Sequence, residues 1–279
     1  PKQPMRPKYI FSSRHTRRAR NKFTTSKSKF PEILKKVIQN SDIIIQVLDA
    51  RFPEDTRNLE VEKKIEAKEK KLIYVLNKSD MVSKKQKHQF KPYIYISSTK
   101  RKGSKDLRNQ IKIQAKKIKK PVEENKIYVG IIGYPNTGKS SLINLLIGKT
   151  SAGTGAEAGF TKGGQKLKLS ENLYLLDSPG VIPEEEYSAI KKDAIAKHVK
   201  VSARGYSQVK EPELIISELM KDYAKQIEAF YKIKSKGDVE ILLEELGKQE
   251  NFLKKGGEIN EDQTARLIIK DWQEGKIKI

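Results

Sequence analysis

An eight-residue segment in the middle of the chain carries the residue types that hold phosphate groups. Residues 133–140 read G-Y-P-N-T-G-K-S and match the pattern G-x-x-x-x-G-K-[ST]. Such a segment can be a plain glycine-rich turn, but here it lies between a predicted strand, Ile127–Ile132, and a predicted helix, Leu142–Ile147. In that context the glycines let backbone N–H groups surround phosphate oxygens at a helix N-terminus. The segment therefore predicts a phosphate-binding loop.

The side chains of this loop have separate expected roles. Lys139 should reach the β- and γ-phosphates of a nucleotide, and the hydroxyl of Ser140 should bind Mg²⁺. The predicted nucleotide contacts of the loop are Asn136, Thr137, Gly138, Lys139, Ser140 and Ser141.

A polar tetrapeptide earlier in the chain indicates which base accompanies the phosphates. Asn77-Lys78-Ser79-Asp80 follows the apolar run Leu72–Leu76, which predicts a buried strand. The carboxylate of Asp80 can accept hydrogen bonds from the ring N–H and the exocyclic amine of guanine, whereas adenine presents an acceptor there. Asn77 should connect this loop to the phosphate loop, and the stem of Lys78 should lie against the base. Alone, the tetrapeptide would be an ordinary turn, but after a buried strand and beside a phosphate loop it predicts guanine.

A second contact to the base is expected after the next strand. Ser97, Ser98 and Thr99 follow the run Tyr93–Ile96, and small residues there, Ser97 and Ser98 above all, let backbone amides approach the guanine oxygen. The same residues also fit a generic Ser/Thr turn, so the sequence leaves both interpretations open.

Two further segments predict the remainder of a GTP site. Residues 177–180 read D-S-P-G and match D-x-x-G, so Asp177 should bind Mg²⁺ through water and the N–H of Gly180 should meet the γ-phosphate. Thr161, in a stretch rich in Gly, Thr and Ala, is the candidate to complete the Mg²⁺ shell. Ras-like enzymes carry a Gln after D-x-x-G, but this chain has Val181, which cannot orient the attacking water. We therefore expect slow intrinsic hydrolysis that needs an added group. The predicted catalytic residues are Lys139, Thr161 and Gly180.

The order of apolar runs predicts an α/β fold followed by helices. Near-continuous apolar runs, typical of strands in a mostly parallel sheet covered on both faces, alternate with helical patterns up to about residue 186. The expected strands are Ile43–Leu48, Leu72–Leu76, Tyr93–Ile96, Ile127–Ile132, Lys166–Leu169 and Leu173–Leu176. Helices are predicted at 104–119, 213–233, 239–246 and after a cap at Asn260. We expect a basic flexible arm at 1–27, a P-loop GTPase domain at 28–186 and a smaller all-α domain at 187–279.

The charge of the chain is large and unevenly distributed. Of a formal net charge of +23, residues 1–30 contribute +10 without any acid, and residues 100–120 contribute +9. This pattern favours a polyanionic partner such as nucleic acid, with a solvated lysine-rich surface, common in heat-adapted proteins, as the alternative.

The composition excludes several classes of function. The chain has no Cys, which excludes disulfides, thiol catalysis and Cys-ligated zinc and agrees with a reducing cytoplasm. Its three His are scattered, so we expect no transition-metal site. No apolar run approaches the roughly 20 residues that span a bilayer, and we expect no secretory signal.

The motifs occur in a rotated order, with the base-reading motif at 77–80 ahead of the phosphate loop at 133–140 and the D-x-x-G motif at 177–180. This order resembles the circularly permuted GTPases of ribosome assembly, the YlqF/YawG group. Further matches are L-D-A-R-F-P at 48–53, G-T-G-A-E-A-G-F-T at 153–161 and G-G-E-I-N-E-D-Q-T-A at 256–265. The similarity extends over almost the whole chain beyond the arm.

The resemblance implies a circularly permuted GTPase fold with a C-terminal helical domain. It implies GTP or GDP and Mg²⁺ as ligands, an activating potassium ion bound with the help of Asn136, and action on the large ribosomal subunit or its precursor, through rRNA and ribosomal proteins. Relatives place a catalytic His in a short N-terminal motif, but the matching region Phe23–Phe30 has none, and His15 lies too far upstream. We expect a cytoplasmic monomer in which switch II leads into the helical domain, so that loss of the γ-phosphate reorients that domain.

Two other functions fit the sequence. The first is a nucleotide-switched RNA- or ribosome-binding module with negligible turnover. The second is a GTPase of protein targeting or of membrane-surface signalling, although the basic arm lacks an apolar face for lipid.

Overall fold

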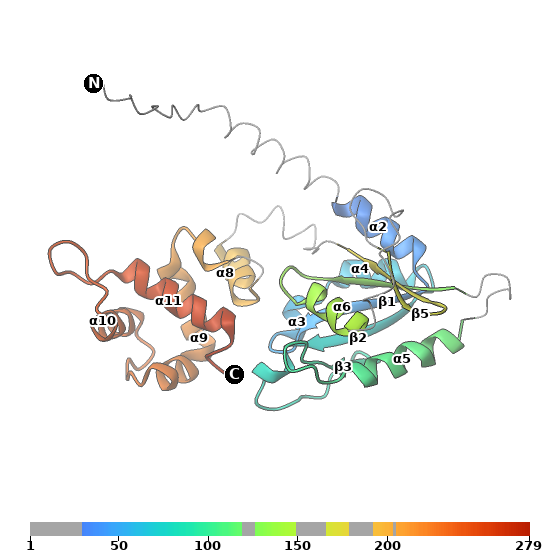
Figure 1. The fold of residues 1–279 in the computed structure, drawn as a ribbon. Helices are drawn as coiled ribbons and strands as arrows, with labels where there is room; N and C mark the ends of the chain where they lie inside the picture. The colour runs from blue at the N-terminus through green and yellow to red at the C-terminus, as the bar shows by residue number, and fades with distance from the viewer. Residues whose placement is uncertain (1–29, 119–125, 149–165, 179–191, 203–204) are drawn as a thin grey trace, which may run out of the picture.

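The computed structural model describes residues 30–118, 126–148, 166–178, 192–202 and 205–279. A six-stranded sheet with covering helices forms the first part of the chain, and a group of helices forms the second (Figure 1). The strands are β1 (Ile43–Asp49), β2 (Lys71–Asn77), β3 (Tyr93–Tyr95), β4 (Ile127–Gly133), β5 (Lys166–Ser170) and β6 (Leu173–Asp177). Each of them overlaps a strand that the apolar runs predict.

The sheet is mostly parallel, as expected, with the strand order β3-β2-β1-β4-β6-β5. Only the β5–β6 pair is antiparallel among these strands. The register sets Asp49 opposite Asn77 and Val47 opposite Gly133. The carboxyl ends of β1, β2 and β4 therefore meet at one edge, where the loops that follow them carry the predicted site residues.

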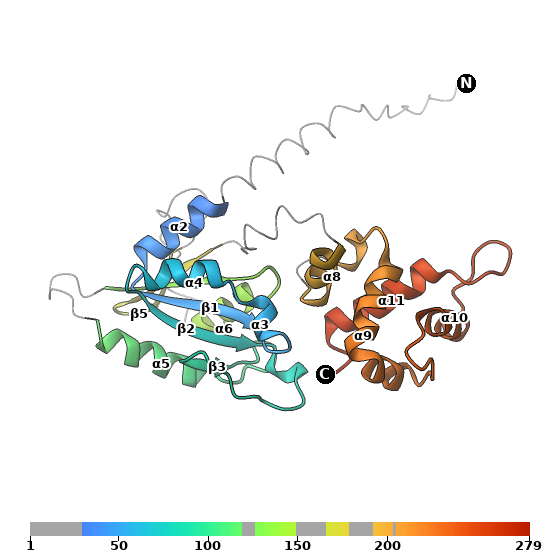
Figure 2. The ribbon, with the colours of Figure 1, turned by 180° about the vertical axis from the view of Figure 1, so that it is seen from behind.

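Helices cover both faces of the sheet, which explains why every residue of β1 is buried (Figure 2). The helices α2 (Phe30–Asn40) and α4 (Leu59–Glu66) pack on one face, and α5 (Ser104–Lys116) and α6 (Lys139–Ile147) on the other. The sequence patterns gave no sign of α4 or of the single turn α3 (Pro53–Thr56). Helix α4 buries only Val61 and Ile65, and its first turn is capped by Asn58, so its periodic signal is short.

The second part consists of α8 (Lys192–Lys200), α9 (Pro212–Tyr231), α10 (Val239–Gln249) and α11 (Glu261–Glu274), which we call the helical unit. The predicted cap of α11 is confirmed, because Asn260 Oδ1 accepts a hydrogen bond from the N–H of Gln263 at 3.2 Å. None of the helices in the described ranges is long and apolar enough to cross a membrane. The domain limits expected at residues 27 and 187 lie outside the described residues, so that division stays a prediction.

The helical unit and the sheet part share an apolar cluster. Phe52, in the segment after β1, stacks on Trp272 with ring centroids 5.8 Å apart and meets Tyr223 edge-on at 6.2 Å. Tyr134, in the loop after β4, is 1% exposed and belongs to the same cluster. The helical unit thus packs against the loops at the carboxyl edge of the sheet.

Candidate functional site

A cavity of about 710 Å³ lies at the carboxyl edge of the sheet. It collects most of the predicted site residues: Asn77, Lys78, Asp80, Ser98, Asn136, Gly138, Lys139, Ser140, Ser141 and Asp177. Its wall also includes Thr99, from the Ser/Thr run predicted to contact the base, and three residues that the sequence motifs did not single out as contacts: Met81, Pro135 and Ser178. Two predicted contacts, Ser97 and Thr137, are buried behind the wall at 1% and 0% exposure. The predicted Thr161 and Gly180 lie outside the described residues.

The phosphate loop joins β4 to α6 in the expected strand–loop–helix arrangement. Gly138, with φ +92°, has a left-handed backbone, and a Cβ atom there would overlap the side-chain amide of Asn77. Only glycine fits this position, because both the φ angle and the close approach of Asn77 exclude a side chain. The loop is therefore built against the base-reading motif, and α6 begins directly behind it.

Lys139 points back into the loop. Its Nζ donates to the main-chain oxygens of Gly133 at 3.1 Å and Tyr134 at 2.8 Å. Burial lowers the pKa of Lys139 to about 8, against the attraction of the Asp177 carboxylate. Burial disfavours the charged form of Lys139. The negative charge of an incoming phosphate would stabilise that charged form.

The residues around Asp177 fit a magnesium ion. Burial raises the pKa of Asp177, although the charge of Lys139 and the N–H of Ser178 oppose the rise. Its Oδ1 is buried and has no hydrogen-bond partner among the described residues. Asp177 and Ser140 line the same cavity. Carboxylate and hydroxyl oxygens are the ligands that Mg²⁺ prefers, so the predicted Mg²⁺ residues suit that ion.

Asn77 connects the base-reading motif to two other loops. Its Nδ2 donates to the main-chain oxygen of Thr137 in the phosphate loop at 2.9 Å. Its Oδ1 accepts from the N–H of Ser98 at 3.2 Å and from the hydroxyl of Ser98 at 2.9 Å. The predicted connecting role of Asn77 therefore agrees with its contacts, and Ser98 lies beside it on the cavity wall.

Asp80 is held at the cavity by two hydroxyl groups. Its Oδ1 accepts from the hydroxyl of Ser97 at 2.6 Å, and its Oδ2 accepts from Thr99 at 3.3 Å. Asp80 lies in the 3-10 turn η1 (Ser79–Met81), which begins after Lys78 in a left-handed conformation. Ser97 therefore orients the carboxylate and does not line the cavity, which differs from the base contact expected for it.

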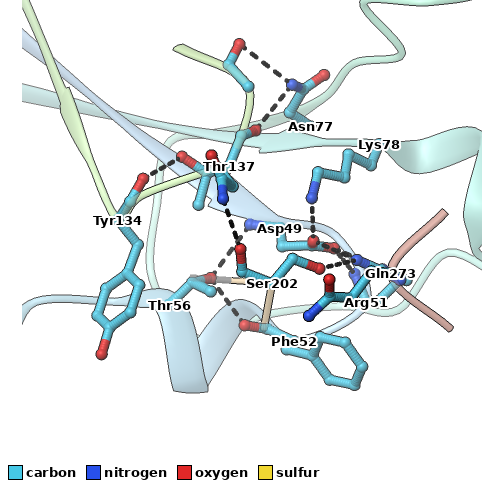
Figure 3. A network of polar contacts seen from close by, with 12 residues as sticks. Asp49, Arg51, Phe52, Thr56, Asn77, Lys78, Tyr134, Thr137, Ser202 and Gln273 are labelled. Carbon is cyan, nitrogen blue, oxygen red and sulfur yellow. Dashed lines mark hydrogen bonds and ion pairs between the residues drawn. The ribbon is translucent and has the colours of Figure 1, made fainter. Parts of the chain in front are cut away.

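Behind the cavity, Lys78 enters a buried charge network that the sequence motifs did not predict (Figure 3). Its Nζ lies 2.8 Å from Asp49 Oδ2, and Arg51 contacts the same carboxylate through Nε at 3.0 Å and Nη2 at 2.8 Å. Burial alone would raise the pKa of Asp49, but the hydrogen bonds and charges of Arg51 and Lys78 bring it below its usual value. The network is therefore a charged carboxylate between two cations.

Hydrogen bonds link these loops to the helical unit and to the residues that follow its helices. Arg51 Nη1 donates to the main-chain oxygen of Trp272 at 2.9 Å. Asn136, in the phosphate loop, donates through Nδ2 to the main-chain oxygen of Ser202 at 2.7 Å. Nothing in the motifs indicates these contacts, because Arg51 and Trp272 are far apart in the sequence.

Comparison with known proteins agrees with this geometry. The family model described as a 50S ribosome-binding GTPase matches residues 128–243. A GTP-binding protein of Methanocaldococcus jannaschii is 40% identical over 251 residues, which cover 88% of this chain and 65% of that protein. The GTPase grn1 of Schizosaccharomyces pombe is 30% identical over 296 residues (92% and 62%), and nucleolar GTP-binding protein 2 of Saccharomyces cerevisiae is 34% identical over 258 residues (88% and 51%). The chain thus spans about half to two thirds of the length of these relatives.

Two solved structures share the fold. GDP-bound YlqF from T. maritima has a TM-score of 0.64 and 23% identity, with 88% of this chain and 95% of that chain covered. GNP-bound YlqF from T. maritima has a TM-score of 0.63 and 23% identity, with 90% and 95% covered. The rotated motif order, the sheet and these matches confirm the resemblance that the motifs predict, and the chain has a circularly permuted P-loop GTPase fold similar to that of YlqF.

Proposed function

We propose that the protein binds GTP and GDP with Mg²⁺ in this cavity and hydrolyses GTP slowly, as a cytoplasmic assembly factor of the large ribosomal subunit. The observation that carries the proposal is the position of Asp80. Its carboxylate is fixed by Ser97 and Thr99 on the wall of the cavity that also contains Lys139 and Asp177. One cavity thus presents an acceptor pair for guanine and a cation for phosphates.

The residues of the cavity have distinct roles in the proposed reaction. Lys139 binds the β- and γ-phosphates, and Ser140 and Asp177 hold Mg²⁺, which supplies positive charge against the charge that develops on the phosphates. Thr161 and Gly180 would complete the Mg²⁺ shell and the γ-phosphate contact. Val181 cannot orient water, so we infer that the ribosomal particle supplies or positions the activating group.

Charge and relatives support the ribosomal partner. Lys105, Lys112 and Lys116 are exposed along α5, and residues 1–30 carry ten Lys or Arg and no acid. Such surfaces bind the phosphates of rRNA through salt-dependent contacts. The family description names the 50S ribosome, and relatives include nucleolar GTP-binding proteins. We infer that rRNA and ribosomal proteins of the large subunit are the partners and that the protein binds them as a monomer.

The first test is base selectivity, measured by calorimetry. We expect GDP to bind tighter than ADP by roughly 10⁴-fold, because adenine leaves the carboxylate of Asp80 facing an acceptor. Asp80→Asn should weaken GDP binding about 100-fold and improve the binding of xanthosine diphosphate, whose exocyclic oxygen accepts from the new amide. Equal affinity of the wild-type protein for GDP and ADP would contradict the proposal.

A second candidate function is a nucleotide-switched ribosome-binding module with negligible turnover, which Val181 favours. Single-turnover GTP hydrolysis with and without large ribosomal subunits separates the two. Acceleration by subunits supports the enzyme, and an unchanged, negligible rate together with GTP-dependent co-sedimentation supports the switch. Replacing K⁺ by Na⁺ in the same assay tests whether Asn136 serves a potassium site.

A further inference from the structure

The end of α11 and the residues after it lie against the base-reading loop at several points. Gly275, with φ +74°, ends α11 in a left-handed conformation. A methyl group at Gly275 would lie 2.5 Å from Sδ and 2.8 Å from Cγ of Met81. Met81 lines the cavity and belongs to the same 3-10 turn as Asp80. The side chain of Met81 therefore occupies the space that a side chain at position 275 would need.

A second contact involves Ser83, which follows Met81 by two residues. The main-chain oxygen of Ile279 accepts from the hydroxyl of Ser83 at 3.0 Å and from the N–H of Ser83 at 3.3 Å. Residues 275 and 279 thus hold both ends of the short segment 81–83, directly after the residue that is predicted to read the base.

A third contact reaches the motif from behind. The main-chain oxygen of Trp272 accepts from Arg51. The guanidinium of Arg51 also contacts Asp49, the carboxylate that binds Lys78 (Figure 3). The side chains of Asp49 and Arg51 are 0% and 1% exposed, so this chain of contacts is enclosed. Three contacts from residues 272–279 therefore converge on residues 78–83.

We propose that residues 272–279 position the base-reading loop, so that docking of the helical unit sets the affinity and the selectivity of the cavity for guanine. The proposal rests on the function proposed above and adds that Gly275 is a positioning residue. Its physical basis is that Asp80 and Met81 share one short turn, so a shift of Met81 moves the carboxylate away from the guanine amine.

Two glycines make a matched experiment. Gly275 and Gly237 both have a left-handed backbone, at φ +74° and +84°, but a methyl group at Gly237 would meet nothing within 4 Å. Gly275→Ala and Gly237→Ala therefore impose a similar backbone strain, and only the first displaces Met81. The measurements are the affinities for GDP and for inosine diphosphate, which lacks the exocyclic amine, and the melting temperature of each variant.

We expect Gly275→Ala to weaken GDP binding about fivefold and to reduce the preference for GDP over inosine diphosphate, since coupled neighbours have effects of this size. Gly237→Ala should lower the melting temperature through its backbone strain but keep the wild-type affinity and preference. In a Met81→Ala background, which removes the displaced atoms, adding Gly275→Ala should have no further effect on binding.

The outcomes separate the two proposals. If the wild-type protein does not prefer GDP over inosine diphosphate and ADP, the function proposed for the cavity is wrong. If it does, but both glycine variants bind alike, the positioning role of residues 272–279 is wrong. The positioning role is also wrong if Gly275→Ala has an equal effect with Met81 and with Ala at position 81.

Discussion

The two ends of the cavity differ in how their polar side chains are satisfied. At the base end, Asn77, Lys78 and Asp80 each have protein partners at hydrogen-bonding distance. At the phosphate end, Asp177 has a buried oxygen without a partner among the described residues, and burial lowers the pKa of Lys139 to about 8. The base end is thus preorganised, whereas the phosphate end is completed by a ligand.

This difference indicates where each end obtains its free energy. Preorganised groups need no rearrangement when the base arrives, so the base end favours selectivity. The unpartnered oxygen of Asp177 and the buried charge of Lys139 destabilise the nucleotide-free protein and are stabilised when phosphate and Mg²⁺ arrive, so the phosphate end favours affinity. Removing a carboxylate behind the base end should therefore destabilise the nucleotide-free protein, whereas removing the carboxylate of the phosphate end should stabilise it.

The largest effect is expected behind the base end. Asp49→Asn leaves the guanidinium of Arg51 buried without its carboxylate, and breaking a buried pair costs about 3 to 5 kcal/mol of the free energy of unfolding. Urea denaturation at pH 7 measures the loss. Glu60→Gln is the control, because Glu60 forms an exposed pair with Lys64 on α4 and should change stability by less than about 0.5 kcal/mol. Equal stabilities of the two variants would show that the buried network does not stabilise the fold.

The same pair of proteins gives a pH test. The pKa of Asp49 is lower in the folded protein than its usual value. The stabilisation by its carboxylate is therefore complete above the unfolded pKa of about 3.9 and is lost as the pH falls through the folded pKa. The stability difference between wild type and Asp49→Asn should shrink when denaturation is repeated below pH 4.

A smaller effect is expected from removing Lys139, the cation of the phosphate end. It should change the free energy of nucleotide binding rather than the free energy of unfolding. Lys139→Ala removes the ammonium that would meet the β-phosphate of GDP, which should weaken GDP binding by about 3 kcal/mol, or roughly 100-fold. The nucleotide-free protein should lose little stability, because burial already disfavours the charged lysine. Lys225→Ala, on the exposed side of α9, is the control for calorimetry and thermal melting. Wild-type affinity in Lys139→Ala would remove the phosphate end from the proposed site.

The two ends also differ in how far the sequence predicts them. Five of the six strands follow from near-continuous apolar runs, since strands covered on both faces need apolar residues at most positions, whereas the edge strand β5 alternates Lys with Leu. Each motif has fixed residue spacing within its own loop, so most of the described site residues line the cavity as the local sequence indicates. Sequence spacing alone does not show that the hydroxyl of Ser97 binds Asp80 and faces away from the cavity.

The contacts with the helical unit escape prediction for a different reason. Arg51 and Trp272 are 221 residues apart, and their contact joins a guanidinium to a main-chain oxygen, which any residue offers. The sequence marks Asp49 and Arg51 only as part of the L-D-A-R-F-P match at 48–53, which assigns them no physical role. Such long-range polar contacts depend on how two packed units meet, and no local pattern encodes that arrangement.

The smallest expected change in stability is a gain, whereas the substitutions above cause losses. It therefore tests the contrast between the two ends of the cavity directly. Asp177→Asn replaces a carboxylate whose pKa is raised by burial with a neutral amide, so the nucleotide-free protein should gain about 1 kcal/mol after allowance for its part exposure to solvent. Thermal melting should rise by roughly 2 to 4 °C. Asp222→Asn, on the exposed side of α9, should leave the melting temperature unchanged.

The gain in stability should come with a loss of ligand response. Mg²⁺ should no longer tighten GTP binding by Asp177→Asn, because an amide oxygen holds the ion more weakly than a carboxylate. A protein that becomes more stable and less responsive to Mg²⁺ would show that the unsatisfied oxygen at the phosphate end is kept for the ion. A loss of stability would instead place Asp177 with the satisfied carboxylates of the base end, and the contrast between the two ends would fail.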